Sequence, residues 1–88
     1  MTDAPFLLLT QDACPQCERL KLMLSAPLKG KFDRQIEVLH RQQQPDDFAS
    51  VAEQYGVRAT PVLIHRASGQ VLSETGGLGA VKAFLEQA

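Results

Sequence analysis

The sequence predicts a small α/β fold with the element order βαβαββα, in which helices cover both faces of one four-stranded mixed sheet. Three observations predict it. Short apolar runs alternate along the chain with stretches whose apolar residues recur at the helical period. Strands that are joined through a helix favour parallel pairing with a right-handed crossover. A turn between two apolar runs near the C-terminus favours an antiparallel pair.

The first half of the chain predicts a strand, a helix and a second strand. Phe6–Leu9 is a continuous apolar run, typical of a central strand that is covered on both faces. Pro15 is a residue type favoured at the first helical position, and the apolar stripe that follows it stops before Pro27. Apolar and polar residues then alternate over Phe32–His40, which predicts the second strand.

The second half predicts a helix, a hairpin and a terminal helix. Pro45 and two acidic residues open a helix that Gly56 ends. Val62–Ile64 and Val71–Leu72 flank a Ser-Gly turn and predict two antiparallel strands. Leu78–Leu85 carries the apolar stripe of a last helix. The 88 residues are expected to form one domain over residues 1–88.

Composition excludes several classes of partner. The net charge is −1 and the nine Lys and Arg residues are scattered, so we expect no nucleic-acid partner and no anionic membrane surface. The polar stretch Arg41–Gln44 is predicted to be a solvated loop. Met1–Ala4 lacks the basic start of a signal peptide, and the apolar run after it is too short to span a bilayer. A cytoplasmic location and a monomeric state are therefore expected.

Both cysteines of the chain lie in one tetrapeptide, Cys14-Pro15-Gln16-Cys17, between the first strand and the first helix. The first turn of a helix offers unpaired N–H groups and the positive end of the macrodipole, which favour an anion. We therefore expect the pKa of Cys14 to lie below that of a free thiol, and its thiolate to act as a nucleophile. Cys17 follows on the same helix face and can resolve a mixed disulfide on Cys14.

Two other interpretations of the cysteines were weighed. They can be small core residues, or half of a zinc site completed by His40 and His65. Structural zinc sites usually pair their histidines at close spacing, whereas these two are far apart in the sequence. A two-cysteine motif beside a βαβ pattern in a reducing compartment favours redox chemistry, and we predict no metal.

Three segments together resemble the thioredoxin superfamily at glutaredoxin size: the Cys14–Cys17 motif that opens the first helix, Tyr55–Pro61 before the hairpin, and Gly76–Gly77 before the last helix. The resemblance covers Phe6–Leu85. It implies the thioredoxin fold and the activity of a thiol–disulfide oxidoreductase.

The same resemblance implies roles for individual residues. Pro61 would be the family's cis-proline facing the cysteines, and the backbone of Thr60 would bind an extended substrate. Pro15 would stiffen the turn between the cysteines. The remaining substrate-binding positions would be Gln16, Arg58, Gly76 and Gly77.

The motif residues depart from both subfamilies. Glutaredoxins commonly carry Tyr at the position of Gln16, a basic residue within the segment that here is Gln11-Asp12-Ala13, and an acid after the glycine pair. Arg58 is then the one remaining candidate for the carboxylates of glutathione. Thioredoxins usually carry a tryptophan before the motif and a buried acid in the preceding strand, and this chain has neither. Glu37, His40 or water stay open as the proton acceptor for Cys17.

The sequence thus predicts a small oxidoreductase in which Cys14 attacks a disulfide and Cys17 resolves the intermediate. Its substrates would be disulfide-containing proteins or small molecules. No cofactor is expected to be bound, and either glutathione or thioredoxin reductase with NADPH would supply electrons. The rival prediction is a thioredoxin-fold binding module, in which the motif is vestigial or holds a metal or a cluster shared between two chains.

Overall fold

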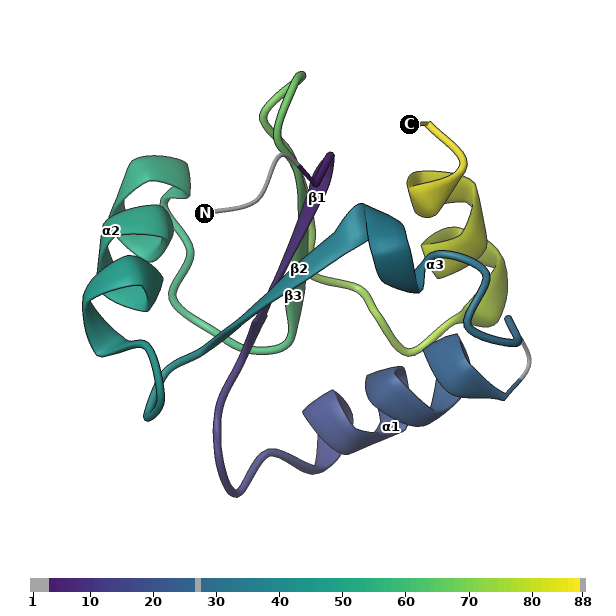
Figure 1. Ribbon diagram of the computed structural model, residues 1–88, viewed down its shortest axis with the longest axis horizontal. Coiled ribbons are helices and arrows are strands. Elements are labelled where there is room, and N and C mark those ends of the chain that lie inside the picture. The colour runs from purple at the N-terminus through teal and green to yellow at the C-terminus, as the bar shows by residue number, and fades with distance from the viewer. Residues whose placement is uncertain (1–3, 27, 88) are drawn as a thin grey trace.

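The chain forms a four-stranded mixed sheet and three helices in a computed structural model that describes residues 4–26 and 28–87 (Figure 1). The α/β class and the element order are those that the sequence predicts. In chain order the elements are β1 (Phe6–Thr10), α1 (Pro15–Ser25), β2 (Ile36–His40), α2 (Pro45–Tyr55), β3 (Val62–His65), β4 (Gln70–Leu72) and α3 (Leu78–Leu85). Pro27, the predicted limit of the first helix, and Met1–Asp3 lie outside the described residues.

The sheet has the strand order β2-β1-β3-β4. The strand β1 pairs in parallel with β2, to which the helix α1 connects it, and antiparallel with β3. The short strand β4 pairs antiparallel with β3 and completes the hairpin. Thr10 is in register with His40, so the carboxyl ends of β1 and β2 meet at one edge of the sheet.

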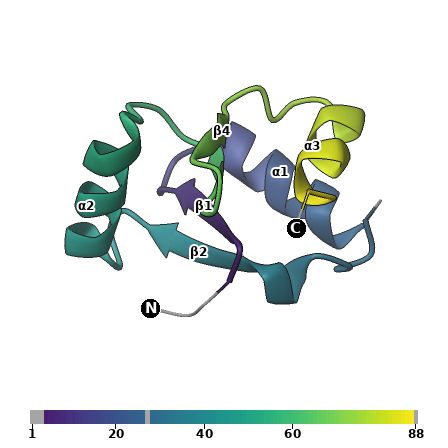
Figure 2. The same cartoon turned by 90° about the horizontal axis from the view of Figure 1, so that it is seen from above.

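The helices lie on both faces of the sheet, with α2 on one side and α1 and α3 on the other (Figure 2). All five residues of β1 are buried, as expected of a central strand. Side chains alternate along the strand, so Phe6 and Leu8 pack with α1 and α3, while Leu7 and Leu9 pack with α2. The apolar run therefore divides its residues between two cores.

Local sequence signals set the ends of the helices. Pro15 occupies the first turn of α1, where its missing N–H removes no helical hydrogen bond. Gly56 ends α2 with a left-handed φ of 69°, and its N–H donates back to the last turn of the helix. Within the described part of the chain, no helix is long and apolar enough to cross a membrane.

The predicted second strand is wrong at its beginning. Asp33–Gln35 forms a 3₁₀ turn, and β2 starts only at Ile36. Gly30 adopts a left-handed φ of 68°, and its carbonyl accepts a hydrogen bond from the N–H of Asp33 at 3.2 Å. Phe32 is buried in the core from this turn rather than from a strand. An apolar residue that is buried from a turn produces the same sequence pattern as one that alternates along a strand.

Candidate active site

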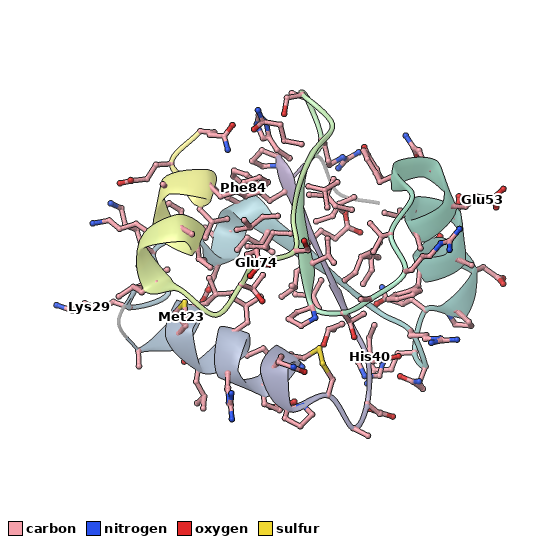
Figure 3. All side chains as sticks on the ribbon, turned by 180° about the vertical axis from the view of Figure 1, so that it is seen from behind. Met23, Lys29, His40, Glu53, Glu74 and Phe84 are labelled. Carbon is pink, nitrogen blue, oxygen red and sulfur yellow. A yellow bond between two sulfur atoms is a disulfide. The ribbon has the colours of Figure 1, made fainter. Side chains whose placement is uncertain are left out.

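The two cysteines form a disulfide at the beginning of α1. Cys14 is the N-cap residue of the helix, Pro15 follows it, and Cys17 lies in the first turn. Figure 3 shows the bond between the sulfur atoms beside the start of this helix. The predicted redox pair is thus brought together in its oxidised form.

The two sulfur atoms have different surroundings. The residue Cys14 is 8% exposed and Cys17 only 1%. The backbone N–H of Cys17 donates to Cys14 Sγ at 3.2 Å, and the hydroxyl of Thr60 approaches the same sulfur at 3.6 Å. Donors directed at Cys14 Sγ would stabilise negative charge on that atom once the disulfide opens.

Thr60 and Pro61 approach the disulfide from the loop before β3. The peptide bond between them is cis, as the resemblance implies, and Pro61 is buried. The contact between the Thr60 hydroxyl and Cys14 Sγ joins residues that are 46 positions apart in the sequence. The structure therefore places this predicted substrate-binding segment against Cys14.

A set of hydrogen bonds joins the loop after β1 to the turn after β2, and we call this set the clasp. His40 Nε2 lies 2.9 Å from Asp12 Oδ1, and the N–H of Asp12 donates to Gln42 Oε1 at 2.9 Å. The N–H of Arg41 donates to the carbonyl of Thr10 at 2.9 Å. Because Cys14 follows this loop directly, the clasp fixes the backbone that leads to Cys14.

Two backbone donors favour one tautomer of the His40 ring. The N–H groups of Gln42 and Gln43 both point at Nδ1, each at 3.2 Å, so this nitrogen carries the lone pair. The ring proton is then on Nε2, which donates it to Asp12. Both ring nitrogens are engaged in the clasp.

The two side chains that the sequence offered as proton acceptors for Cys17, Glu37 and His40, are directed or engaged elsewhere. Glu37 is in register with Leu7, and residues in register on parallel strands point to the same face, here the face of α2. Cys17 lies on α1, on the other side of the sheet. Both nitrogens of His40 are engaged by Asp12 and the turn after β2.

Two pockets are lined by residues that contact or neighbour the cysteines in the chain. The first, of about 180 Å³, includes Thr60, and the second, of about 110 Å³, includes Gln16. The first is lined by Gln11, Arg41, Phe48, Val57, Arg58, Ala59 and Thr60. The second is lined by Gln16, Arg19, Met23, Thr75 and Gly76.

The predicted substrate-binding residues are divided between the two pockets. Arg58 and Thr60 line the first pocket, and Gln16 and Gly76 line the second. Gly77 lines neither pocket and is the N-cap residue of α3.

The first pocket is cationic. Within the described part of the chain, no ion pair is formed by Arg58 or Arg41, and Arg41 Nη1 donates to the neutral Gln11 Oε1 at 3.2 Å. The pocket therefore offers a carboxylate two positive charges, and its lining residue Thr60 contacts Cys14 Sγ.

The two histidines of the zinc interpretation lie far apart. His40 is in register with Thr10 at one end of β1, and His65 with Phe6 at the other end. The described residues contain no cluster of three or more His, Cys, Asp or Glu side chains that could hold a metal ion.

The sequence interpretation missed the residues of the clasp. Arg41–Gln44 is exposed in the main, as predicted, but Gln42 and Gln44 accept backbone hydrogen bonds from Asp12 and His40. One signal could have found them. Polar residues directly follow both β1 and β2, and the ends of parallel strands meet at one edge of a sheet.

No protein-family model matches the chain, and no curated protein sequence matches it significantly.

Proposed function

We propose that this chain is a thiol–disulfide oxidoreductase of the thioredoxin fold that works through Cys14 and Cys17. The observation that carries the proposal is the disulfide at the N-terminus of α1, with two hydrogen-bond donors directed at the more exposed sulfur. The proposed chemistry needs a sulfur that a substrate can reach and a second sulfur next to it. The disulfide between Cys14 and Cys17, with Cys14 the more exposed residue of the two, supports this assignment.

The proposed reaction begins with the reduced protein. The Cys14 thiolate attacks one sulfur of a substrate disulfide, and the other substrate sulfur leaves as a thiolate. Cys17 then loses its proton and attacks Cys14 Sγ, which restores the intramolecular disulfide and releases the second substrate thiol. An external thiol or dithiol reductant must then reduce this disulfide and is itself oxidised.

The charge of the first pocket supports a substrate that carries a carboxylate near its disulfide. Arg58 and Arg41 line this pocket together with Thr60, whose hydroxyl approaches Cys14 Sγ. Glutathione disulfide meets this description, and so does an acidic segment of a protein. The electron donor in this proposal is glutathione or thioredoxin reductase with NADPH, and the compartment is the reducing cytoplasm.

The test is a coupled assay that follows NADPH oxidation with a small disulfide as substrate. Reduced glutathione with its reductase is supplied in one arm, and thioredoxin reductase alone in the other. Turnover in either arm supports the proposal and identifies the donor. Absence of turnover in both arms, with an intact disulfide in the purified protein, would contradict it and favour a binding module.

Two variants test the roles of the cysteines in the same assay. Cys14→Ser should abolish turnover, because it removes the nucleophile. Cys17→Ser should accumulate a mixed disulfide on Cys14 that mass spectrometry detects. Turnover retained by Cys14→Ser would overturn the assignment of the nucleophile.

A further inference from the structure

Thr10, at the end of β1, carries a hydroxyl that is buried and unsatisfied. The residue is 0% exposed, and Oγ1 has no hydrogen-bond partner among the described residues. Leaving a buried hydroxyl unpaired costs free energy, and native proteins contain few such groups. The hydroxyl therefore calls for a partner that the oxidised protein does not present to it.

The strand places this hydroxyl on the face that α1 covers. Phe6 and Leu8 pack in the core with α1 and α3, and alternation puts Thr10 on the same face. Leu8 and Leu24 line one cavity together, so the middle of β1 lies against the later turns of α1. The helix runs back along the strand, and so the end of β1 lies toward the first turn of the helix.

The first turn of α1 contributes one buried polarizable group to this end of the core, the sulfur of Cys17. Cys17 is 1% exposed and belongs to the buried stripe of the helix with Leu20 and Leu24. The two titratable side chains of β2 are not available as partners. His40 uses both ring nitrogens in the clasp, and Glu37 lies on the opposite face of the sheet.

We propose that the Thr10 hydroxyl is the hydrogen-bond partner of the Cys17 sulfur in the reduced protein, an inference that rests on the proposed redox function. Reduction by a dithiol adds two electrons and two protons to the disulfide, breaks the bond between the sulfur atoms and oxidises the reductant to a disulfide. Cys17 is then a thiol or a thiolate. A hydroxyl both donates and accepts, so it pairs with either form.

This hydrogen bond would exist in one redox state only. It stabilises the dithiol, while the unpaired hydroxyl destabilises the disulfide. Both effects favour reduction. Thr10 is thus a residue that raises the reduction potential of the pair and stabilises Cys17 after it loses its proton.

The experiment compares the wild-type protein with Thr10→Val, which keeps the shape and removes the hydroxyl, and with Thr10→Ser, which keeps the hydroxyl. Each protein is equilibrated with mixtures of reduced and oxidised dithiothreitol, and the dithiol fraction is counted by alkylation and mass spectrometry. The Thr10→Val variant should favour the disulfide about tenfold more than the wild type, which corresponds to about 30 mV. Thr10→Ser should stay within about threefold of the wild type.

Urea unfolding of both redox forms separates this role from a purely structural one. Thr10→Val should leave the oxidised form at least as stable as the wild type and make the reduced form less stable. Equal redox equilibria in Thr10→Val and the wild type, or equal loss of stability in both redox forms, would overturn the inference. Because neither measurement needs turnover, an inactive wild type with the predicted shift would contradict the proposed function and leave the hydrogen bond standing.

Discussion

The two sides of the disulfide are built in opposite ways. On one side, the clasp ties the loop before Cys14 to the turn after β2 through side chains and backbone. On the other side, the segment before α3 contains Gly76 and Gly77. An added Cβ at either glycine would have no heavy atom within 4 Å. The clasped side is held by polar contacts, and the glycine side leaves space.

This difference teaches how a small protein can fix the backbone before Cys14 and leave space at the segment before α3. Asp12 and His40 are 28 positions apart in the sequence. Their contact therefore holds the loop after β1 against the end of β2. Ala13 adopts a left-handed φ of 53°, which a residue other than glycine holds only when its surroundings require it. Among the described residues, the glycine side has no comparable contacts at Gly76 and Gly77, where an added Cβ would meet no heavy atom within 4 Å.

The largest effect that would test the comparison is expected from His40→Ala. The substitution removes a ring that is mostly buried and leaves Asp12, Gln42 and Gln43 each without a partner for one group. We expect the free energy of unfolding to fall by about 3 kcal/mol, since three hydrogen bonds are lost and each is worth about 1 kcal/mol. Urea denaturation of the oxidised protein measures it.

Gln43→Ala is the matched control for His40→Ala. It lies in the same turn, its side chain is exposed, and it keeps the backbone N–H that His40 accepts. Its stability should stay within about 0.5 kcal/mol of the wild type. If the two variants were equally stable, the clasp would contribute nothing and the comparison would fail.

A smaller effect is expected from reversing one charge on each side. Arg58 lines the cationic pocket and Arg19 the pocket on the glycine side. For a small disulfide that carries carboxylates, Arg58→Glu should lower kcat/KM about tenfold, because a charged contact is worth about 1.5 kcal/mol or more. Arg19→Glu should change it by less than about threefold.

Hydroxyethyl disulfide, which is neutral, provides the control for the charge variants. Both variants should reduce it at a rate within about twofold of the wild type. An equal loss with the neutral and the anionic substrate would show that Arg58 acts on the fold rather than on the charge of the substrate.

The smallest effect is expected from serine at the two glycines. Gly77 is the N-cap residue of α3, has an extended backbone, and makes no side-chain cap. Gly77→Ser should raise the free energy of unfolding by a few tenths of a kcal/mol, because a serine hydroxyl can cap the helix. Thermal unfolding at equal protein concentration measures the gain.

Gly76→Ser is the counterpart, since Gly76 lines the pocket on the glycine side and caps no helix. It should leave the stability unchanged and raise the KM of a bulky disulfide. A stability gain from Gly76→Ser and none from Gly77→Ser would contradict the assignment of the cap.

Local patterns predicted most of the fold. The run Phe6–Leu9 predicted a strand that is covered on both faces, and the start of α1 at Pro15 and the end of α2 before Gly56 follow from single residues. The predicted strand over Phe32–His40 began too early. A hydrogen bond within a turn at Gly30 cannot be read from an alternating pattern.

The pairing of the two cysteines was predictable from the sequence, and the contacts that support the site were not. The spacing of Cys14 and Cys17 at the start of a helix after a strand predicted that the two sulfur atoms lie together, because one helical turn brings them within reach. The contacts of Asp12 with His40 and Gln42 depend on the parallel pairing of β1 with β2, which joins residues about 30 positions apart. The unpaired hydroxyl of Thr10 likewise appears only when the packing of α1 on the sheet is known.

The disulfide between Cys14 and Cys17 closes a very short ring, since the two residues are separated by three positions. The stabilisation that a cross-link provides by reducing the chain entropy of the unfolded state grows with the length of the loop. For so short a ring it is only about 1.5–2 kcal/mol, against nearly 5 kcal/mol for a loop of about 100 residues. Opening the bond therefore changes the conformational freedom of the unfolded chain very little. The folded core can persist through repeated oxidation and reduction, because its stability comes from the apolar packing on the two faces of β1.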